Sequence, residues 1–166
     1  SNELGRFPKD WKTDKLINCA DYVDYRGKTP RKVGHGVFLV TAKNIKNGYI
    51  DYEESKEYVD PEEYDKIMSR GKPQIGDVLI TTEAPLGSVA SVDDPKIALA
   101  QRVIKYRSRD ELTNKYLKCF LLSDRFQDIL VKNSSGSTAT GIRGSLLHEL
   151  PVCYPPTLEE QRAIAE

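Results

Sequence analysis

The 166-residue sequence is poor in the residues that build disulfide frameworks and zinc sites. Its three cysteines, Cys19, Cys119 and Cys153, are scattered, odd in number and outside any CxxC pair. This pattern indicates free thiols in a reducing compartment. The two histidines, His35 and His148, are so far apart that no zinc motif can be built from local spacing.

Long apolar runs and net charge are lacking too. No stretch of about 18 apolar residues is present, so no membrane span is expected. No secretory signal opens the chain, and we therefore expect a cytoplasmic protein. The 25 basic and 25 acidic residues cancel, which excludes a protein that is basic throughout but not one with a basic face. The length fits one domain with a real core.

Motifs of nucleotide-binding and hydrolytic enzymes are missing as well. The stretch GSTATGIR (136–143) has the glycine spacing of a phosphate loop, but it lacks the following Lys and Ser/Thr and comes after a helical segment. GxGxxG and GxSxG are absent. Asp51, Glu54 and Lys56 loosely resemble the carboxylates and lysine of metal-dependent nucleases, which must converge on a metal. A small nuclease is therefore a minor alternative to a chain without catalysis.

The patterns that are present predict an α+β domain. Short apolar runs predict strands within residues 37–40, 74–82, 83–92, 97–108 and 151–154. Asn47-Gly48 predicts a tight turn, and Asp60-Pro61 begins a short helix over 60–68. Apolar spacings of three and four predict one amphipathic helix over 114–132, capped by Thr113.

The closing stretch TLEEQRAIAE has the start signal of a further helix. Thr157 occupies the N-cap position, and Glu160 completes a capping box. Leu158 and Ile164 belong to an apolar stripe that begins here. Isolated helices shorter than about 12–15 residues are marginal in water, so we expect these to be the first turns of a longer helix.

Charges are segregated along the chain despite the net balance. Residues 26–46 and 96–109 contain bases and no acid, whereas 51–65 are acidic with Lys56 alone opposing. If the two basic stretches share a face, they provide the footprint that a polyanion needs. We expect the acidic stretch to face away or to contact another protein.

Several motifs occur in one order along nearly the whole chain. They are FPKDW, RGKTP, LVTAKNIKNGYID, YVDPEEYDK, IGDVLITTEAPLGSVASV, ALAQRVIKYR, YLKCFLLSDRFQDIL and GSTATGIRGSLLHELPVCYPPTLEEQRAIA. Their order resembles the target recognition domain of a type I restriction-modification specificity subunit. The resemblance implies a twisted, mixed, largely antiparallel sheet flanked by helices over 1–156. It also implies that 157–166 begin a conserved spacer helix, which pairs as a coiled coil.

The resemblance further implies a non-catalytic role in reading one half of a bipartite double-stranded DNA target. No cofactor would bind to this chain. Methyltransferase (modification) subunits would use S-adenosylmethionine, and restriction subunits would use ATP and magnesium. A second recognition domain, or a second copy of the chain, would join through the spacer helix. The alternative from another class is a protein-assembly module, with 51–65 and the last helix as its interfaces.

Candidate DNA-binding residues follow from the chemistry of their side chains. Base reading favours planar Arg, Asn and Gln side chains, whereas phosphates accept from many donors. The candidates for base edges are Arg26, Arg31, Asn44 and Gln101. The candidates for phosphates are Lys28, Lys32, Lys43 and Lys46. The other candidates are Thr29, Asn47, Arg102, Ser137 and Thr138.

Overall fold

The computed structural model describes residues 4–27, 29–135 and 141–166. Lys28, Ser137 and Thr138 lie outside the described residues. The strands are β1 (Lys12–Lys15), β2 (Ala20–Asp24), β3 (Lys32–Val33), β4 (Val37–Val40), β5 (Glu57–Val59), β6 (Val78–Thr82), β7 (Leu86–Ser91), β8 (Ile97–Leu99), β9 (Val103–Ser108) and β10 (Pro151–Tyr154). The helices are α1 (Leu16–Cys19), η1 (Ala42–Asn44), η2 (Pro61–Glu63), α2 (Tyr64–Ile67), α3 (Asn114–Leu122), α4 (Asp124–Lys132), α5 (Gly144–Leu147) and α6 (Leu158–Ala165).

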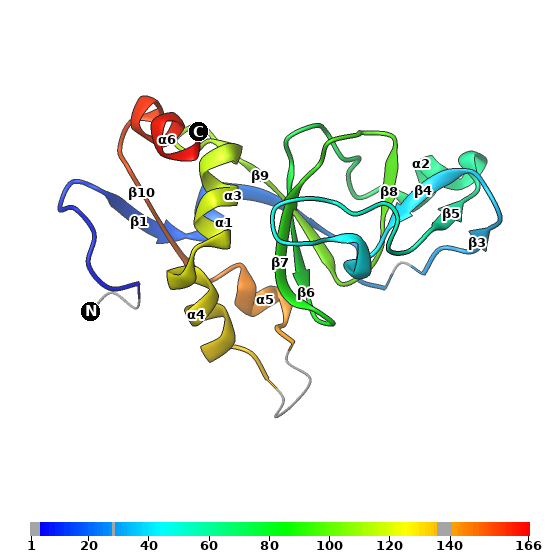
Figure 1. The fold of residues 1–166 in the computed structure, drawn as a ribbon, viewed down its shortest axis with the longest axis horizontal. Coiled ribbons are helices and arrows are strands. Elements are labelled where there is room, and N and C mark those ends of the chain that lie inside the picture. Colours follow the sequence, from blue (N-terminus) through cyan, green and yellow to red (C-terminus); the bar gives the residue numbers. More distant parts are fainter. Residues whose placement is uncertain (1–3, 28, 136–140) are drawn as a thin grey trace.

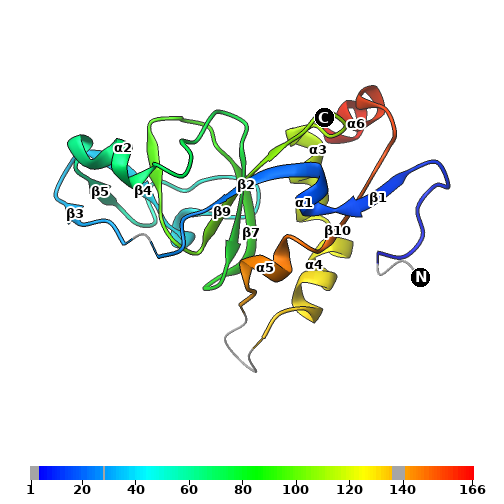
Figure 2. The same cartoon turned by 180° about the vertical axis from the view of Figure 1, so that it is seen from behind.

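The described strands are divided among three sheets. A central antiparallel sheet has the order β2-β9-β6-β7, and a smaller sheet has the order β3-β5-β4-β8, in which β4 and β8 run parallel. β1 pairs with β10. Figures 1 and 2 show the central sheet between a helical end, with α3, α4 and α6, and the end that carries β3 to β5. The α+β class with mixed, largely antiparallel strands is confirmed, although the strands do not form a single sheet.

The inner strand β6 of the central sheet is buried on both faces, which explains its continuous apolar run. In β6, Val78 and Ile80 belong to one apolar cluster together with Leu117 of α3. Leu79, between them, belongs to a second cluster with Leu39 of the smaller sheet. Successive side chains of a strand point to opposite faces, so helices cover one face and the smaller sheet covers the other.

The predicted helix over 114–132 is two helices, α3 and α4, because the chain is extended at Ser123. The Ser123 hydroxyl accepts a hydrogen bond from the Phe126 N–H at 3.3 Å and thereby caps α4. An N-cap serine stabilises the start of a new helix, and this local signal overrides the continuous apolar stripe. Thr113 caps α3 as predicted, with its hydroxyl 3.1 Å from the Tyr116 nitrogen.

The predicted strand over 97–108 is also divided. β8 belongs to the smaller sheet and β9 to the central sheet, and a turn at Gln101-Arg102 separates them. Arg102 has a positive φ of 73°, a conformation that ends a regular strand. The polar Gln101-Arg102 pair interrupts the apolar run at this turn and leaves both side chains exposed.

Two short predicted features are confirmed. The tight turn after residue 46 closes with the Lys46 N–H donating to the Tyr49 carbonyl at 2.9 Å. The helix predicted over 60–68 consists of η2 and α2, and the Asp60 carboxylate accepts from the Glu62 N–H at 3.0 Å. These features could be predicted because a turn or a cap depends on a few adjacent residues.

The last helix, α6, is fixed to the domain by its first turns. The Thr157 hydroxyl accepts from the Glu160 N–H at 3.2 Å, which is the N-cap half of the predicted capping box. The buried Gln161 amide accepts from the Thr113 N–H at 2.9 Å and donates to the Glu111 carbonyl at 2.8 Å. The start of α6 is therefore held against the start of α3. Among the described residues, no helix is both long and apolar enough to cross a membrane.

Candidate nucleic-acid interface

Candidate residues from three separate segments line one hollow of about 330 Å³. They are Thr29, Lys32, Lys43, Gln101 and Arg102. The parallel pairing of β4 with β8 explains this convergence, because it brings the carboxyl ends of both strands to the same edge of the smaller sheet. The segment that carries Lys43 follows β4, and the turn that carries Gln101 and Arg102 follows β8.

A second hollow, of about 360 Å³, continues from the first. It is lined by Lys46 and Asn47, and both hollows share Lys43 and Ala84. We call the two adjoining hollows the basic groove. The groove thus unites seven of the predicted positions, which are Thr29, Lys32, Lys43, Lys46, Asn47, Gln101 and Arg102.

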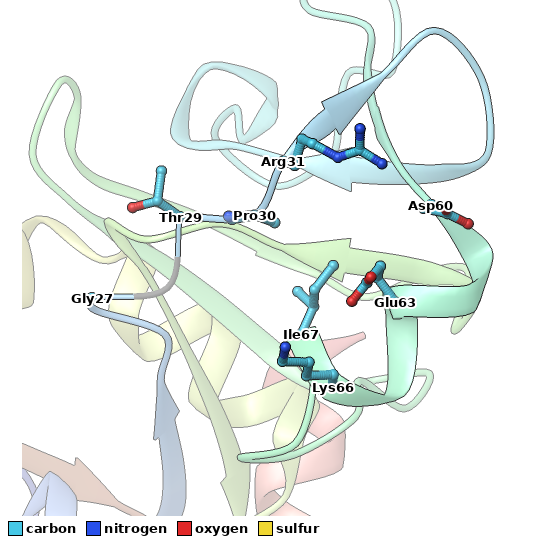
Figure 3. A pocket seen from close by; sticks show the side chains of 8 residues that line it. All are labelled: Gly27, Thr29, Pro30, Arg31, Asp60, Glu63, Lys66 and Ile67. Carbon is cyan, nitrogen blue, oxygen red and sulfur yellow. The ribbon is translucent and has the colours of Figure 1, made fainter.

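Arg31 lies in a neighbouring hollow of about 310 Å³. Figure 3 shows Arg31 above Glu63, Lys66 and Ile67, which come from η2 and α2. Thr29 and Pro30 line both this hollow and the basic groove. Arg31 is therefore adjacent to the groove, although it does not line it.

Arg26 lies in another hollow, which it lines with Tyr22, Arg70 and His148. Arg70 is committed to the fold there, since its guanidinium donates to the Arg26 carbonyl at 2.7 Å. His148 stacks on Tyr22 with 3.7 Å between ring centroids, and its Nδ1 is 2.6 Å from the Tyr106 hydroxyl. Burial lowers the pKa of His148 below its usual value. The structure does not bring Arg26 into the basic groove.

Asn44 is a correction to the predicted set of base-reading residues. Asn44 is the last residue of η1, and it is completely buried. The amide oxygen accepts from the Thr41 N–H at 2.9 Å, and the amide nitrogen donates to the carbonyls of Asp51 and Ser55 at 2.9 and 2.8 Å. Burial and these bonds leave Asn44 no means of reaching a base edge. It instead fixes the loop that presents Lys43 and Lys46.

The acidic segment does not face away from the bases, contrary to expectation. Lys32 pairs with Glu57 at 2.9 Å, and Lys46 lies 3.7 Å from Glu54. β5 carries Glu57 into the same sheet as β3, which carries Lys32. The pairing of strands therefore interleaves acids with bases that are segregated along the sequence.

Glu83 lies beside the basic groove, next to its lining residues Ala84 and Arg102, and it was not predicted from the sequence. It precedes Ala84 at the turn between β6 and β7, and its Oε1 lies 3.3 Å from Nε of Arg102. The stretch TTEAPLG gives only the general signal of a turn. The proximity of Glu83 to Arg102 depends on the pairing of β6 with β9, which no local pattern encodes.

The basic stretch 96–109 contributes less positive charge to the surface than predicted. Nζ of the buried Lys105 lies 3.4 Å from Asp77, and Arg107 Nε donates to the same carboxylate at 2.7 Å. Burial lowers the pKa of Lys105. Burial opposes ionisation of Asp77 as well, but hydrogen bonds from Arg107 and the Gln74 N–H hold the pKa of that carboxyl below its usual value. Lys105 and Arg107 therefore serve the fold.

The three residues of the nuclease alternative do not converge on one site, because each has a different partner. Lys56 pairs with Glu53 at 2.9 Å, Glu54 lies by Lys46, and the Asp51 carboxylate accepts from the Glu53 N–H at 3.0 Å. Within the part of the chain that the structure describes, no three His, Cys, Asp or Glu residues are grouped to hold a metal ion. The geometry gives a nuclease no support.

The three cysteines are free thiols, as predicted. Burial raises the pKa of the Cys19 thiol to about 11. A buried thiol with a raised pKa is inert at neutral pH, because the thiolate is the reactive form. Cys19 therefore acts as a small apolar residue of the core.

Comparison with known proteins identifies the family. The family model described as "Type I restriction modification DNA specificity domain" matches residues 8–166. The type I restriction enzyme MjaIX specificity subunit of Methanocaldococcus jannaschii is 26% identical, over 96% of this chain and 38% of that protein. This chain thus spans about 38% of the length of that curated relative.

Solved structures share the fold. The HsdS subunit of Thermoanaerobacter tengcongensis matches with a TM-score of 0.65 and 22% identity, over 97% of this chain and 37% of that one. The type I restriction-modification S subunit from M. genitalium matches with a TM-score of 0.66 and 17% identity, over 99% and 40% of the two chains. On the family match over 8–166, the chain belongs to the type I restriction-modification DNA specificity domain family.

Proposed function

We propose that this chain is a DNA recognition domain that reads one half of a bipartite double-stranded target and has no catalysis of its own. The observation that carries the proposal is the basic groove. It gathers lysines, an arginine and a glutamine from β3 and from the segments after β4 and after β8. Such a set combines donors for phosphates with planar side chains for base edges.

The side chains of the groove are suited to two different kinds of DNA contact, with phosphates and with base edges. Lys43 lines both hollows and has no carboxylate partner among the ion pairs of the described residues. It is therefore our principal phosphate contact, assisted by Lys32 and Lys46. Gln101 and Arg102 project from a turn whose backbone is fixed by β8 and β9, and they are suited to base edges.

We further propose how the domain is assembled with other chains. Residues 1–156 form the recognition domain, and 157–166 begin a spacer helix that leads to a second recognition domain or a second copy. Modification subunits would supply S-adenosylmethionine and restriction subunits ATP and magnesium, while this chain binds no cofactor, and the complex would act in the cytoplasm. The anchoring of α6 through Gln161 supports a fixed angle between spacer and domain.

The assembly-module alternative has one observation in its favour. Phe7, Trp11 and Phe120 line an apolar hollow, and Ile164 of α6 at its edge is 45% exposed. Figure 1 places α3 and α6 at the opposite end of the domain from β3 and β4. A protein contact there would leave the basic groove free, so it would accompany DNA reading.

The proposal is tested in a complete specificity subunit assembled with its modification subunits. Lys43→Ala should weaken binding to all duplexes alike and reduce the salt dependence, log Kd against log[salt], by about one unit. Lys9→Ala, which removes an exposed lysine from the N-terminal segment, is the matched control. Unchanged affinity and salt slope for Lys43→Ala would contradict the groove as the DNA site.

A domain exchange tests the reading of sequence itself. Residues 1–156 replace the corresponding domain of an active specificity subunit, and methylated sites are then mapped by sequencing across a genome. The half-site read by the exchanged domain should change while the other half-site is retained. If the methylated sequence stays the same, the chain does not specify DNA sequence.

A further inference from the structure

Glu83 places a carboxylate beside a groove that we propose for a polyanion. Its Oε1 lies 3.3 Å from Nε of Arg102, and both side chains are 52% exposed. A carboxylate beside a phosphate path repels DNA, and an exposed ion pair adds little to folding stability. Neither affinity for DNA nor folding stability therefore explains a carboxylate at this position. We consider instead a role in the choice of base, through its contact with Arg102.

The backbones on both sides of this pair are fixed. The Thr82 N–H donates to the Arg102 carbonyl at 2.9 Å, and the Ile142 N–H donates to the Thr82 carbonyl at 3.0 Å. Glu83 itself forms an antiparallel bridge with Gly141. Arg102 has φ of 73°, a costly conformation for a residue with a side chain, which persists where the surroundings impose it. The chain thus holds Arg102 and Glu83 facing each other.

The contact leaves the outer edge of the guanidinium available. Glu83 approaches Nε, and Nη1 and Nη2 donate to no other residue in the described part of the chain, so both groups remain for a second partner. Two parallel N–H groups of arginine match O6 and N7 of guanine in the major groove. A nearby carboxylate orients such a fork and makes it a poorer partner for phosphate.

We propose that Arg102 reads a guanine of the half-site and that Glu83 is the positioning residue that determines this specificity. The inference rests on the proposed function. The lysine pairs of the groove differ in chemistry, because an ammonium is a point charge without a planar fork. The Lys32–Glu57 pair, at 2.9 Å in the same groove, is therefore the internal control.

The test uses the complete specificity subunit with its modification subunits and a library of duplexes randomised over the recognised positions. Methylated members are identified by sequencing. Arg102→Lys keeps the charge but removes the fork, and should lower the preference for guanine at one position by about tenfold or more. Glu83→Gln should lower the preference at that same position by several-fold. Glu57→Gln frees Lys32 and should change the affinity for all duplexes alike, without altering the preference for any base.

The possible outcomes separate the two proposals. Identical base preferences for the wild type, Arg102→Lys and Glu83→Gln would overturn the guanine assignment while Lys43→Ala still tests the groove. Loss of preference at a cytosine in Glu83→Gln, with Arg102→Lys unchanged, would also overturn it, because Glu83 would then read a base directly. Thermal unfolding of each variant within about 1 °C of the wild type shows that folding is unaffected.

Discussion

The Asp77 carboxylate and the Lys105 ammonium lie 3.4 Å apart with only 1% and 4% of their side chains exposed. Arg107 donates to the other carboxylate oxygen at 2.7 Å, and the Gln74 N–H completes the set at 2.8 Å. A buried charge is tolerated only when its partner and hydrogen bonds are present. The pair therefore fixes β9, which carries Lys105, to the start of β6.

Asp77→Asn should destabilise the domain by about 3 kcal/mol, because it leaves the Lys105 charge buried without a carboxylate. The measurement is urea unfolding at neutral pH, followed by circular dichroism. Asp21→Asn is the control, since it removes the 70% exposed partner of Arg109. If both variants unfold at the same urea concentration as the wild type, the buried pair contributes nothing to stability.

Sequence patterns predicted the elements whose cause is local. The helix over 60–68 and the turn after Lys46 depend on a few neighbouring residues, and both are present. The breaks at Ser123 and at Gln101-Arg102 were missed, because a continuous apolar pattern suits one element or two. At Ser123 the decisive signal is a local N-cap, which the longer apolar stripe concealed. At Gln101-Arg102 the break depends on β8 and β9 joining different sheets, which is decided only in three dimensions.

The candidate site shows the same division. Residue chemistry selected Lys43 and Arg102 as candidates, and the parallel β4–β8 pairing brings their segments together. It could not separate Asn44, an amide buried by its own loop, from exposed Asn47. Residue chemistry also could not identify Glu83, because the role proposed for this carboxylate depends on its proximity to Arg102, which the sequence does not show.

Asn44→Ala should lower stability by about 1–3 kcal/mol, because the Thr41 N–H and two carbonyls lose their buried partner. Asn47→Ala removes an exposed amide from the same loop and should leave stability unchanged. Thermal unfolding by calorimetry compares the two variants. Equal unfolding temperatures for both variants would show that the Asn44 amide does not hold the loop together.

Ser123→Ala should destabilise the domain by about 1 kcal/mol, since it removes the acceptor for the Phe126 N–H at the start of α4. Ser123→Asp retains an acceptor at the N-cap and should restore most of the loss. Chemical denaturation of the three proteins measures the difference. An Asp variant as unstable as the Ala variant would mean that the cap is not the cause of the helix break.

His148 should make stability depend on pH below neutrality. Burial lowers the pKa of its imidazole, an effect to which Arg26 adds and which Asp24 partly offsets. The unfolded chain therefore binds this proton at a higher pH than the folded chain does. The contribution of neutral His148 is complete above about pH 6.5. It is lost as the pH falls from there toward the folded pKa, at up to about 1.4 kcal/mol per pH unit.

The comparison is between the wild type, His148→Gln and His35→Gln, each unfolded with urea at intervals from pH 7.5 to 5. His148→Gln should be less stable at pH 7.5, because the contacts with Tyr106 and Tyr22 are weakened. Its stability should fall less steeply with acid than that of the wild type. His35 is exposed, so His35→Gln should retain the wild-type profile. A His148→Gln profile parallel to that of the wild type would assign the acid sensitivity to other groups.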